Sequence, residues 1–367
     1  MLRSRISQLY LVASCESMMS LLPLTLLRPW RHSTDSVTSP SITYFQMRFG
    51  MSPGKPDVTD PWITSADDWP LDLLLELKGA TRIAVVIPAR NEESTIGGVV
   101  RTILDELAAL VDEVVVMDSL SSDQTARAAA EAGARVHSVG EVRPELGIRA
   151  GKGEAIWKSQ FVTNADVTAF IDADLTEWGP HFVRGVVGPL LADPQVQLCR
   201  GYYDRLLDIG GSVTLEGGRV TQLVARPWLA IFRPELSGMV QPLAGEWAIR
   251  QAMLGSLSIP TGYGVEISTL LDVHSQCGVR AIAQVDLGRC AHRHQSIHDL
   301  GAMAVEVLAV ADRRRLPSGV SAVPHSAVVE DEQVSPNDVV LRSMGEDRQW
   351  AVRTIPIDER PPFNTVS

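Results

Sequence analysis

Short apolar runs alternate with amphipathic stretches from residue 81 onward. The run RIAVVIP at residues 82–88 is continuously apolar, which is typical of a strand buried on both faces of a parallel sheet. Residues 92–110 carry apolar side chains at helical spacing, and residues 122–132 begin with Ser and Asp and are followed by Gly133, as helix capping predicts. The expected strands are residues 82–88, 113–117, 135–139, 167–171 and 281–287, and the expected helices are residues 92–110, 122–132 and 154–161. This alternation predicts an α/β fold with a mostly parallel sheet and flanking helices, in which ligands bind at the carboxyl ends of the strands.

Polar loops follow three of the expected strands, with the sequences PARNEE at 88–93, DSLSSD at 118–123 and DAD at 172–174. The paired carboxylates of Asp172 and Asp174 can place one group toward a ribose or sugar and the other on a divalent cation, because Mg²⁺ bridges protein carboxylates and substrate phosphates. Such a tripeptide alone often only caps a turn, but its position directly after the apolar run VTAFI favours the functional interpretation. Asp118 and Ser119 can accept hydrogen bonds from a base or a ribose, or can simply form an Asx or Ser turn.

Two glycine-containing segments open expected helices and suit anions. In GKGE at residues 151–154, glycines permit close backbone approach, the helix start favours negative charge, and Lys152 adds a cation. The alternative is a flexible loop with a solvated lysine, and no Walker A sequence is present, which excludes a P-loop NTPase. In GGRVT at residues 217–221, amides, the Arg219 guanidinium and the Thr221 hydroxyl together suit a phosphate monoester. A surface helix that merely starts with glycine explains the second segment nearly as well.

The segment AHRHQ at residues 291–295 follows the last expected strand. His292 and His294 alternate, so in extended backbone they point the same way, and one can bind a metal while the other reaches a substrate. A structural histidine is the plainer alternative. A zinc hydrolase needs at least three clustered ligands, and the chain contains no HExxH motif.

Composition narrows the possible partners and the compartment. The 367 residues are 45% apolar and carry a formal net charge of −11, which argues against non-specific binding to nucleic acid or an anionic membrane. An anionic substrate therefore needs a local basic site. The four cysteines form no CxxC pair, which favours free thiols in a reducing compartment and a cytoplasmic protein.

The first fifty residues differ in composition from the rest of the chain. They hold five Arg against one Glu and one Asp, and polar residues and Pro23 interrupt their apolar stretch at residues 9–27. A disordered extension or a misassigned start is the preferred interpretation, and a targeting segment is the alternative. We expect an extension at residues 1–65, a catalytic domain at residues 66–320 divided into a nucleotide-sugar half (66–175) and an acceptor half (176–320), and a weakly structured tail from about residue 315, with 321–367 outside the domain.

Taken together, the motifs resemble one family, the glucosyl-3-phosphoglycerate synthases, which are retaining glycosyltransferases of the Rossmann-like GT-A fold. The resemblance runs from about Trp69 to Arg315 and rests on eight blocks in order: VVIPARNEE, DSLSSDQT, GKGEA, FIDADL, GGRVTQLVARP, QPLAGE, GYGVEI and DLGRCAHRHQ. It implies transfer of glucose from UDP-glucose to 3-phospho-D-glycerate with retention of the α configuration, with Mg²⁺ or Mn²⁺, by a homodimer. An inverting transferase acting on a lipid or polysaccharide, and a non-catalytic nucleotide-sugar-binding paralogue, are the alternatives.

The resemblance also implies roles for individual residues. The donor would contact Pro88, Ala89, Arg90, Asn91, Glu92, Ser119, Lys152, Asp172, Ala173, Tyr263, Gly264, Val265 and Glu266. The acceptor would contact Gly218, Arg219, Val220, Thr221 and His294, and Asp174 with His292 would hold the metal. Lys152, Asp174 and Glu266 would be the catalytic residues. Two positions depart from the family pattern, since Ala173 replaces a usual Ser and His294 replaces a usual Asn, and the second departure places acceptor identity in doubt.

Overall fold

A computed structural model of the chain describes residues 61–209, 212–214, 218–291, 297–315, 337–344 and 350–366. The expectations for His292, for His294 and for the N-terminal extension up to residue 60 lie outside these residues. The described part from residue 61 onward belongs to one compact unit, whose first strand begins at Trp62, four residues before the domain boundary expected from the sequence. None of the helices described is both long enough and apolar enough to cross a membrane.

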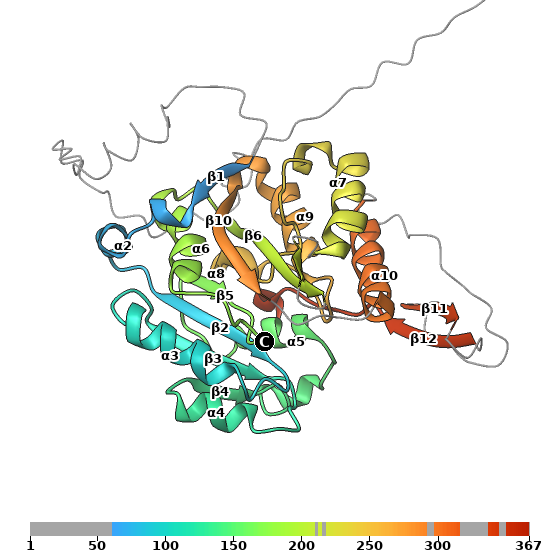
Figure 1. Ribbon diagram of the computed structural model, residues 1–367, viewed down its shortest axis with the longest axis horizontal. Helices are drawn as coiled ribbons and strands as arrows, with labels where there is room; N and C mark the ends of the chain where they lie inside the picture. Colours follow the sequence, from blue (N-terminus) through green and yellow to red (C-terminus); the bar gives the residue numbers. More distant parts are fainter. Residues whose placement is uncertain are drawn as a thin grey trace, which may run out of the picture. The chain divides into compact units, whose positions relative to one another are not determined.

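The centre of this unit is a mixed sheet of nine described strands (Figure 1). Eight of them follow the spatial order β1 (Trp62–Ser65), β10 (Ile282–Ala291), β6 (Leu198–Ile209), β8 (Trp247–Arg250), β5 (Val167–Phe170), β2 (Ile83–Ala89), β3 (Glu113–Asp118) and β4 (Arg135–Ser138), and β7 (Ser212–Thr214) pairs with β6. Only β8 and β7 run antiparallel to their neighbours. The expected mostly parallel sheet is confirmed, and each of the five predicted strands is present.

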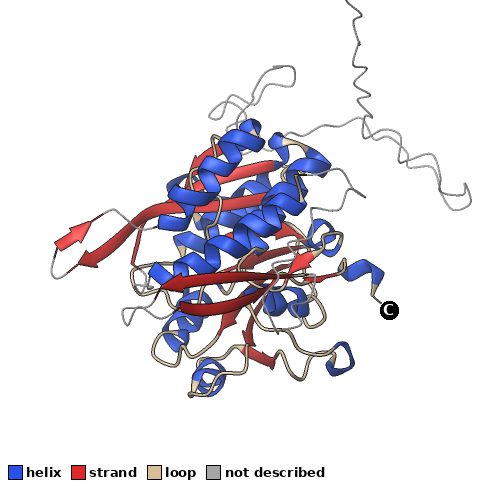
Figure 2. Cartoon of the chain, turned by 90° about the vertical axis from the view of Figure 1, so that its right-hand side faces the viewer, coloured by secondary structure: helices blue, strands red, loops and turns tan. Residues whose placement is uncertain are grey.

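Helices cover the sheet on both faces, as the continuous burial of side chains along its central strands requires (Figure 2). Val86 of β2 and Val115 of β3 pair in register and belong to one apolar core with Trp157 and Trp247. Their neighbours along the strands are equally buried, so they face the opposite layer. The helices are α2 (Leu71–Lys78), α3 (Ile96–Leu107), α4 (Thr125–Glu131), α5 (Lys152–Ser159), α6 (His181–Ala192), α7 (Arg226–Phe232), α8 (Gln251–Gly255), α9 (Val265–Cys277) and α10 (Ile297–Arg313).

Shorter elements connect these layers. A π-helical turn, η4 (Thr221–Ala225), leads directly into α7. The two-residue strand β9 (Ile259–Pro260) precedes α9. The 3-10 turns are η2 (Ala66–Asp68), η3 (Pro144–Leu146), η5 (Pro234–Leu236), η6 (Val279–Ala281) and η7 (Phe363–Thr365).

The expectation of weak structure after residue 315 is wrong for the residues described near the C-terminus. Strands β11 (Asp338–Met344) and β12 (Trp350–Pro356) form an antiparallel hairpin beside α10 (Figure 1). The following strand β13 (Glu359–Arg360) pairs antiparallel with β9 of the main unit. Ile355, Ile357 and Arg360 are buried, so this segment contributes to the core although its acidic, proline-containing sequence has no strong helical or strand periodicity.

Candidate active site

A cavity of about 890 Å³ lies at the carboxyl ends of β2, β3 and β5. This is the edge of a parallel sheet at which α/β proteins bind ligands. The residues that line the cavity come from segments that are far apart in the sequence, from the loop after β2 to strand β12. The predicted site residues that line it are Pro88, Ala89, Arg90, Glu92, Ser119, Lys152, Asp172, Ala173, Asp174, Gly218, Arg219, Val220, Thr221, Tyr263 and Glu266.

Lys152 connects two carboxylates at the floor of this cavity. Its Nζ lies 2.6 Å from Asp172 Oδ1 and 2.9 Å from Glu266 Oε1. Burial opposes the charge of the ammonium, but Asp172 and Glu266 outweigh it, with Glu246 adding to them, so the pKa of Lys152 is raised above its ordinary value. A Cβ at Gly245 would stand 2.0 Å from Asp172 Oδ2, so this glycine leaves the space that the carboxylate occupies.

The glycines around Lys152 serve close packing of the backbone. At Gly153 a Cβ would lie 1.8 Å from the carbonyl oxygen of Pro260, and at Gly151, where φ is +124°, it would lie 2.4 Å from that of Thr261. The amides of Gly153 and Glu154 donate to the carbonyl oxygens of Gly262 (3.3 Å) and Thr261 (2.9 Å). The amides of Gly153 and Glu154 are therefore engaged with the loop after β9 and do not point to an anion, and the anion-binding role expected for Lys152 stays a prediction for its side chain.

Asn91 supports the predicted donor side from behind. It is absent from the cavity lining and has left-handed backbone, with φ of 57°. Its side-chain oxygen accepts hydrogen bonds from the backbone amide (2.8 Å) and the hydroxyl (3.2 Å) of Ser122. The backbone amide of Asn91 donates to the Ser121 hydroxyl (3.0 Å). Asn91 thus joins the loop after β2 to the loop after β3 and fixes the position of each loop relative to the other.

Asp118, at the end of β3, is buried and has one oxygen with no hydrogen-bond partner among the described residues. Its other oxygen accepts from the Ser121 amide at 3.2 Å. A buried carboxylate oxygen in this condition costs free energy unless a donor reaches it. Next to the cavity-lining Ser119, it can accept from a base N–H or a ribose hydroxyl, which is one of the two interpretations that the sequence left open for this pair.

Gly264 and Val265 form the support for Tyr263 and Glu266. Neither lines the cavity; Val265 is fully buried as the first residue of α9, and a Cβ at Gly264 would lie 2.5 Å from the Val310 side chain. Arg200 fixes this helix start from below, since its guanidinium donates to the carbonyl oxygens of Glu266 (2.5 Å) and Ala244 (3.2 Å). Burial lowers the pKa of Arg200 to about 10.

The sequence reasoning missed one wall of the cavity. This wall consists of Leu300, Met303, Glu306 and Val307 from α10 with Ile355 and Pro356 from β12. The spacing of the α10 residues is helical, so a periodicity search beyond residue 295 would have found that helix. No local pattern marks residues 355–356.

Glu306 is the ionisable group of this wall. Its carboxylate accepts hydrogen bonds from the amides of Tyr263 and Gly264, and a Cβ at Gly262 would stand 1.6 Å from its Oε1. Burial, with repulsion from Glu266, raises the pKa of Glu306 from 4.5 to about 7.

Replacing Glu306 by glutamine should change how stability depends on pH. A carboxyl whose folded pKa is raised binds its proton more tightly when folded, so wild-type stability falls as pH rises from 4.5 to about 7. Glu306→Gln removes this loss. The difference in the free energy of unfolding between the variant and wild type should therefore shift in favour of the variant by ~1–3 kcal/mol from pH 5 to pH 8. Urea unfolding at both pH values measures the difference. Glu131→Gln, at an exposed helix position, is the control, and a Glu306→Gln difference that is the same at both pH values would contradict the assignment.

The described residues fit a divalent cation at Asp174. They contain no group of three His, Cys, Asp or Glu side chains of the kind that encloses a metal. Mg²⁺, however, is usually held by one or two carboxylates together with substrate phosphates, and Asp174 lies on the cavity wall in the loop that follows β5. The role predicted for His292 lies outside the described residues and stays a prediction.

Comparison with known proteins agrees with this geometry. The Glycosyl transferase family 2 model matches residues 84–220. The glucosyl-3-phosphoglycerate synthase of Mycobacterium tuberculosis is 44% identical over 264 residues, which cover 71% of this chain and 81% of the relative. This chain belongs to the glucosyl-3-phosphoglycerate synthase family. The synthase of Mycolicibacterium smegmatis is 39% identical over 310 residues, which cover 83% of this chain and 98% of the relative.

Solved structures lead to the same family. A crystal structure of the M. tuberculosis synthase in complex with Mn²⁺, UDP-glucose and phosphoglyceric acid superposes with a TM-score of 0.72 at 38% identity. The match covers 83% of this chain and 98% of that chain. Another crystal structure of the same synthase holds Mg²⁺ and UDP and has a TM-score of 0.71. The expected GT-A-like α/β fold and the resemblance stated from the motifs are therefore confirmed.

Proposed function

We propose that this chain transfers glucose from UDP-glucose to 3-phospho-D-glycerate with retention of the α configuration, using Mg²⁺ or Mn²⁺. The observation that carries the proposal is one cavity that joins both sets of predicted residues. Most residues of the donor set, among them Arg90, Asp172 and Glu266, and the acceptor residues from Gly218 to Thr221 line the same space. Family membership, and a related crystal structure that holds UDP-glucose and phosphoglyceric acid together with Mn²⁺, support the same substrates.

The residues of the cavity suit cleavage of the bond between glucose and diphosphate. A divalent cation at Asp174 and His292 would supply Lewis-acid stabilisation of the diphosphate leaving group. Lys152 keeps Asp172 and Glu266 in place, and these carboxylates can accept hydrogen bonds from sugar hydroxyls as the oxocarbenium-like transition state forms. Asp118 and Ser119 accept from the uridine. We place Glu266 in sugar orientation rather than nucleophilic attack.

Retention then follows because the acceptor hydroxyl attacks glucose C1 on the same face from which the leaving group departs. The bond from glucose C1 to the phosphate oxygen breaks, the acceptor hydroxyl oxygen bonds to C1, and the hydroxyl proton passes to the departing phosphate oxygen. The acceptor carries a phosphate and a carboxylate, so it needs fixed cations within a chain of net charge −11. Among the arginines that line the cavity, Arg219 lies next to Gly218 in the predicted acceptor segment.

The decisive test is a product assay with UDP-glucose, Mg²⁺ or Mn²⁺ and 3-phospho-D-glycerate, followed by NMR of the anomeric proton. We expect glucosyl-3-phosphoglycerate with the α configuration. Binding of UDP-glucose without turnover would instead indicate a non-catalytic paralogue, and a β product would indicate an inverting enzyme.

Truncating the Arg219 side chain should weaken binding of the acceptor without weakening binding of the donor. Losing a charge-assisted hydrogen bond is worth ~1.5–3 kcal/mol, so Arg219→Ala should raise the acceptor KM roughly 10–150-fold and leave the KM for UDP-glucose nearly unchanged. Arg226→Ala is the matched control, because Arg226 lies seven residues, or about two helical turns, further on, is exposed, and donates a hydrogen bond from its guanidinium to Gln222. If Arg219→Ala weakens UDP-glucose and spares the acceptor, the acceptor site lies elsewhere.

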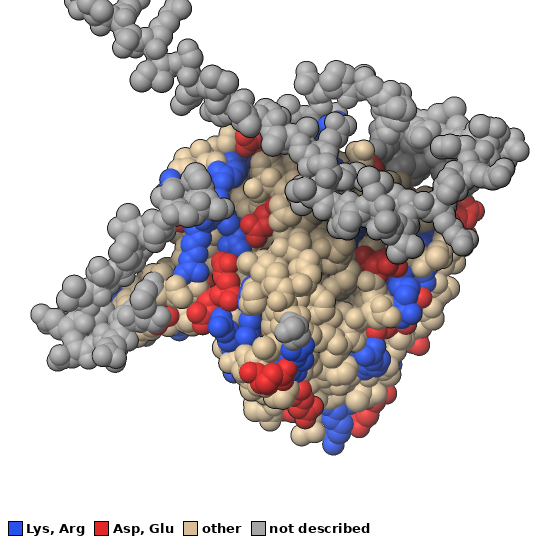
Figure 3. Space-filling model, turned by 180° about the vertical axis from the view of Figure 1, so that it is seen from behind, with Lys and Arg blue, Asp and Glu red and all other residues tan. Residues whose placement is uncertain are grey.

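Two further expectations remain part of this proposal. We propose a cytoplasmic protein, which the free, buried thiol of Cys199 supports. On the face shown in Figure 3, acidic and basic side chains lie side by side, and this arrangement does not favour nucleic acid as a partner. We also propose a homodimer, for which exposed apolar side chains of η4 and α7, Leu223 and Ile231, offer contact area.

A further inference from the structure

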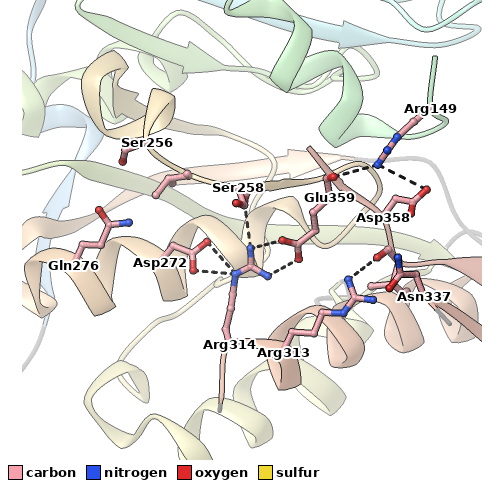
Figure 4. A pocket seen from close by; sticks show the side chains of 12 residues that line it. Arg149, Ser256, Ser258, Asp272, Gln276, Arg313, Arg314, Asn337, Asp358 and Glu359 are labelled. Carbon is pink, nitrogen blue, oxygen red and sulfur yellow. Dashed lines mark hydrogen bonds and ion pairs between the residues drawn. The ribbon is translucent and has the colours of Figure 1, made fainter. Parts of the chain in front are cut away.

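Residues 357–361, within the last described segment of the chain, lie against two walls of the active site. It borders a second, polar cavity of about 580 Å³, where Arg314 bridges Asp272 and Glu359 at 2.9 and 2.8 Å (Figure 4). The charged side chains around this second cavity pair mainly with one another and with backbone, which points to a fastening of the segment rather than to a ligand site (Figure 4). On the active-site side, the amide of Thr261 donates to the carbonyl oxygen of Asp358 at 3.0 Å.

The strongest fastening is a buried group of three charges. The Arg360 guanidinium forms a bidentate pair with Glu154 of α5, with distances of 2.7 Å from Nε and 2.6 Å from Nη2. Lys158, one turn along α5, lies 3.6 Å from the same carboxylate. Arg360, Glu154 and Lys158 are exposed by only 6%, 1% and 0% of their side chains, so none of these charges is screened by water.

The remaining donors of these cations hold the loop between β4 and α5. Arg360 donates to the carbonyl oxygens of Leu146 (2.8 Å) and Gly147 (3.1 Å). Lys158 donates to those of Val139 (2.7 Å) and Gly147 (2.9 Å). Glu154 accepts from the Arg149 amide at 3.3 Å, so both ends and the middle of the loop depend on the same three charges.

This loop is also a wall of the active site. Val139, Ile148, Arg149, Ala150 and Gly151 line the cavity, and the next residue is Lys152. We infer that Arg360 is a positioning residue for the donor side of the active site, because through Glu154 it holds the loop at residues 139–151 that leads into Lys152. The donor side is defined by the proposed function, so the inference rests on that function for its kinetic readout.

Arginine suits this position in a way that lysine does not. The planar guanidinium pairs with both Glu154 oxygens and still has donors for two carbonyl groups, and its flat face lies 4.9 Å from the Trp157 ring centre. Lysine has the charge but cannot make the bidentate pair. Arg360→Lys should therefore retain part of the positioning, whereas Arg360→Met should lose it.

The test compares Arg360→Met and Arg360→Lys with wild type. We expect faster hydrogen exchange of the backbone amides of residues 139–151 in Arg360→Met. We expect kcat/KM for UDP-glucose to fall ~10–100-fold, since a catalytic group misplaced by about 1 Å costs about 100-fold, while the acceptor KM changes little. Arg360→Lys should lie between Arg360→Met and wild type in both measurements.

Arg353→Met is the matched control on the same C-terminal segment, because Arg353 of β12 is exposed and pairs with Asp299 outside the cavity. It should leave both measurements at the wild-type values. Unchanged exchange of residues 139–151 in Arg360→Met, or a lower Tm with wild-type kinetic constants, would overturn the inference. If Arg360→Met gives no folded protein, Arg360→Lys and Trp157→Phe decide in the same way, the latter by removing the 2.8 Å bond from the indole to the carbonyl oxygen of Pro361.

The exchange measurement requires no substrate. If the wild-type protein transfers no glucose, the proposed function fails, while faster exchange of residues 139–151 in Arg360→Met still supports the role of Arg360 in holding the loop.

Discussion

Asp174→Ala should lower kcat at least ~100-fold, because one stabiliser of leaving-group charge is worth ~2.7–4 kcal/mol in the transition state. Asp174 lies on the cavity wall in the loop that follows the buried strand β5, where its carboxylate can bind a cation that also contacts the diphosphate. EDTA should produce a loss of similar size in the wild-type enzyme, reversible by Mg²⁺ or Mn²⁺. Steady-state assays at saturating substrates, with and without EDTA, measure both losses.

Asp105→Ala is the control for this variant. Asp105 is an exposed residue of α3 and does not line the cavity, so its replacement should leave kcat and metal dependence unchanged. Full activity of the wild-type enzyme in EDTA would remove the metal role from Asp174. The Tm of Asp174→Ala shows whether this variant is folded at the assay temperature. If it is not, Asp174→Asn takes its place in the test.

The part of the fold that sequence alone predicts is the part with regular local signals. The continuous run at residues 82–88 gave β2, and the capped helical pattern at residues 122–132 gave α4, which the structure begins at Thr125. The antiparallel strand β8 has no distinguishing pattern, since Trp247, Ala248 and Ile249 are apolar whichever way the strand runs. Strand direction here depends on long-range connections rather than on local sequence.

The candidate site was predicted where residues follow strands, and missed where tertiary contacts assemble it. Residue types and loop positions placed Asp172, Asp174 and Lys152 in one cavity. Nothing local indicated that the amides beside Gly153 are occupied by the loop after β9, or that Arg360 pairs with Glu154 across 206 residues of sequence. Such partners become visible only when the chain is folded, because neither partner needs a special neighbour in sequence.

Lys152→Met should reduce both stability and turnover. The ammonium lies between the Asp172 and Glu266 carboxylates, and its removal leaves two carboxylates facing each other with little water, since Glu266 is only 7% exposed. Removing one partner of a buried ion pair costs ~3–5 kcal/mol, and we expect the low end of this range because Asp172 is 26% exposed. The loss in kcat should be at least ~100-fold, since the proposed site loses a cation beside the leaving diphosphate together with the geometry of the carboxylates proposed to face the sugar.

Two further variants separate these two effects. Lys78→Met removes a lysine of similar exposure that pairs with Asp112 at 3.0 Å, away from the cavity, so it should lower the free energy of unfolding and leave kcat at the wild-type value. Lys152→Arg retains the positive charge but replaces a compact ammonium by a larger planar fork, so it should recover most of the stability and little of the turnover. Urea unfolding and steady-state kinetics on all three variants decide between these outcomes. If Lys152→Met keeps the wild-type kcat while losing stability, Lys152 only neutralises Asp172 and Glu266, and its place in the reaction passes to the other cations that line the cavity, Arg90, Arg149 and Arg219.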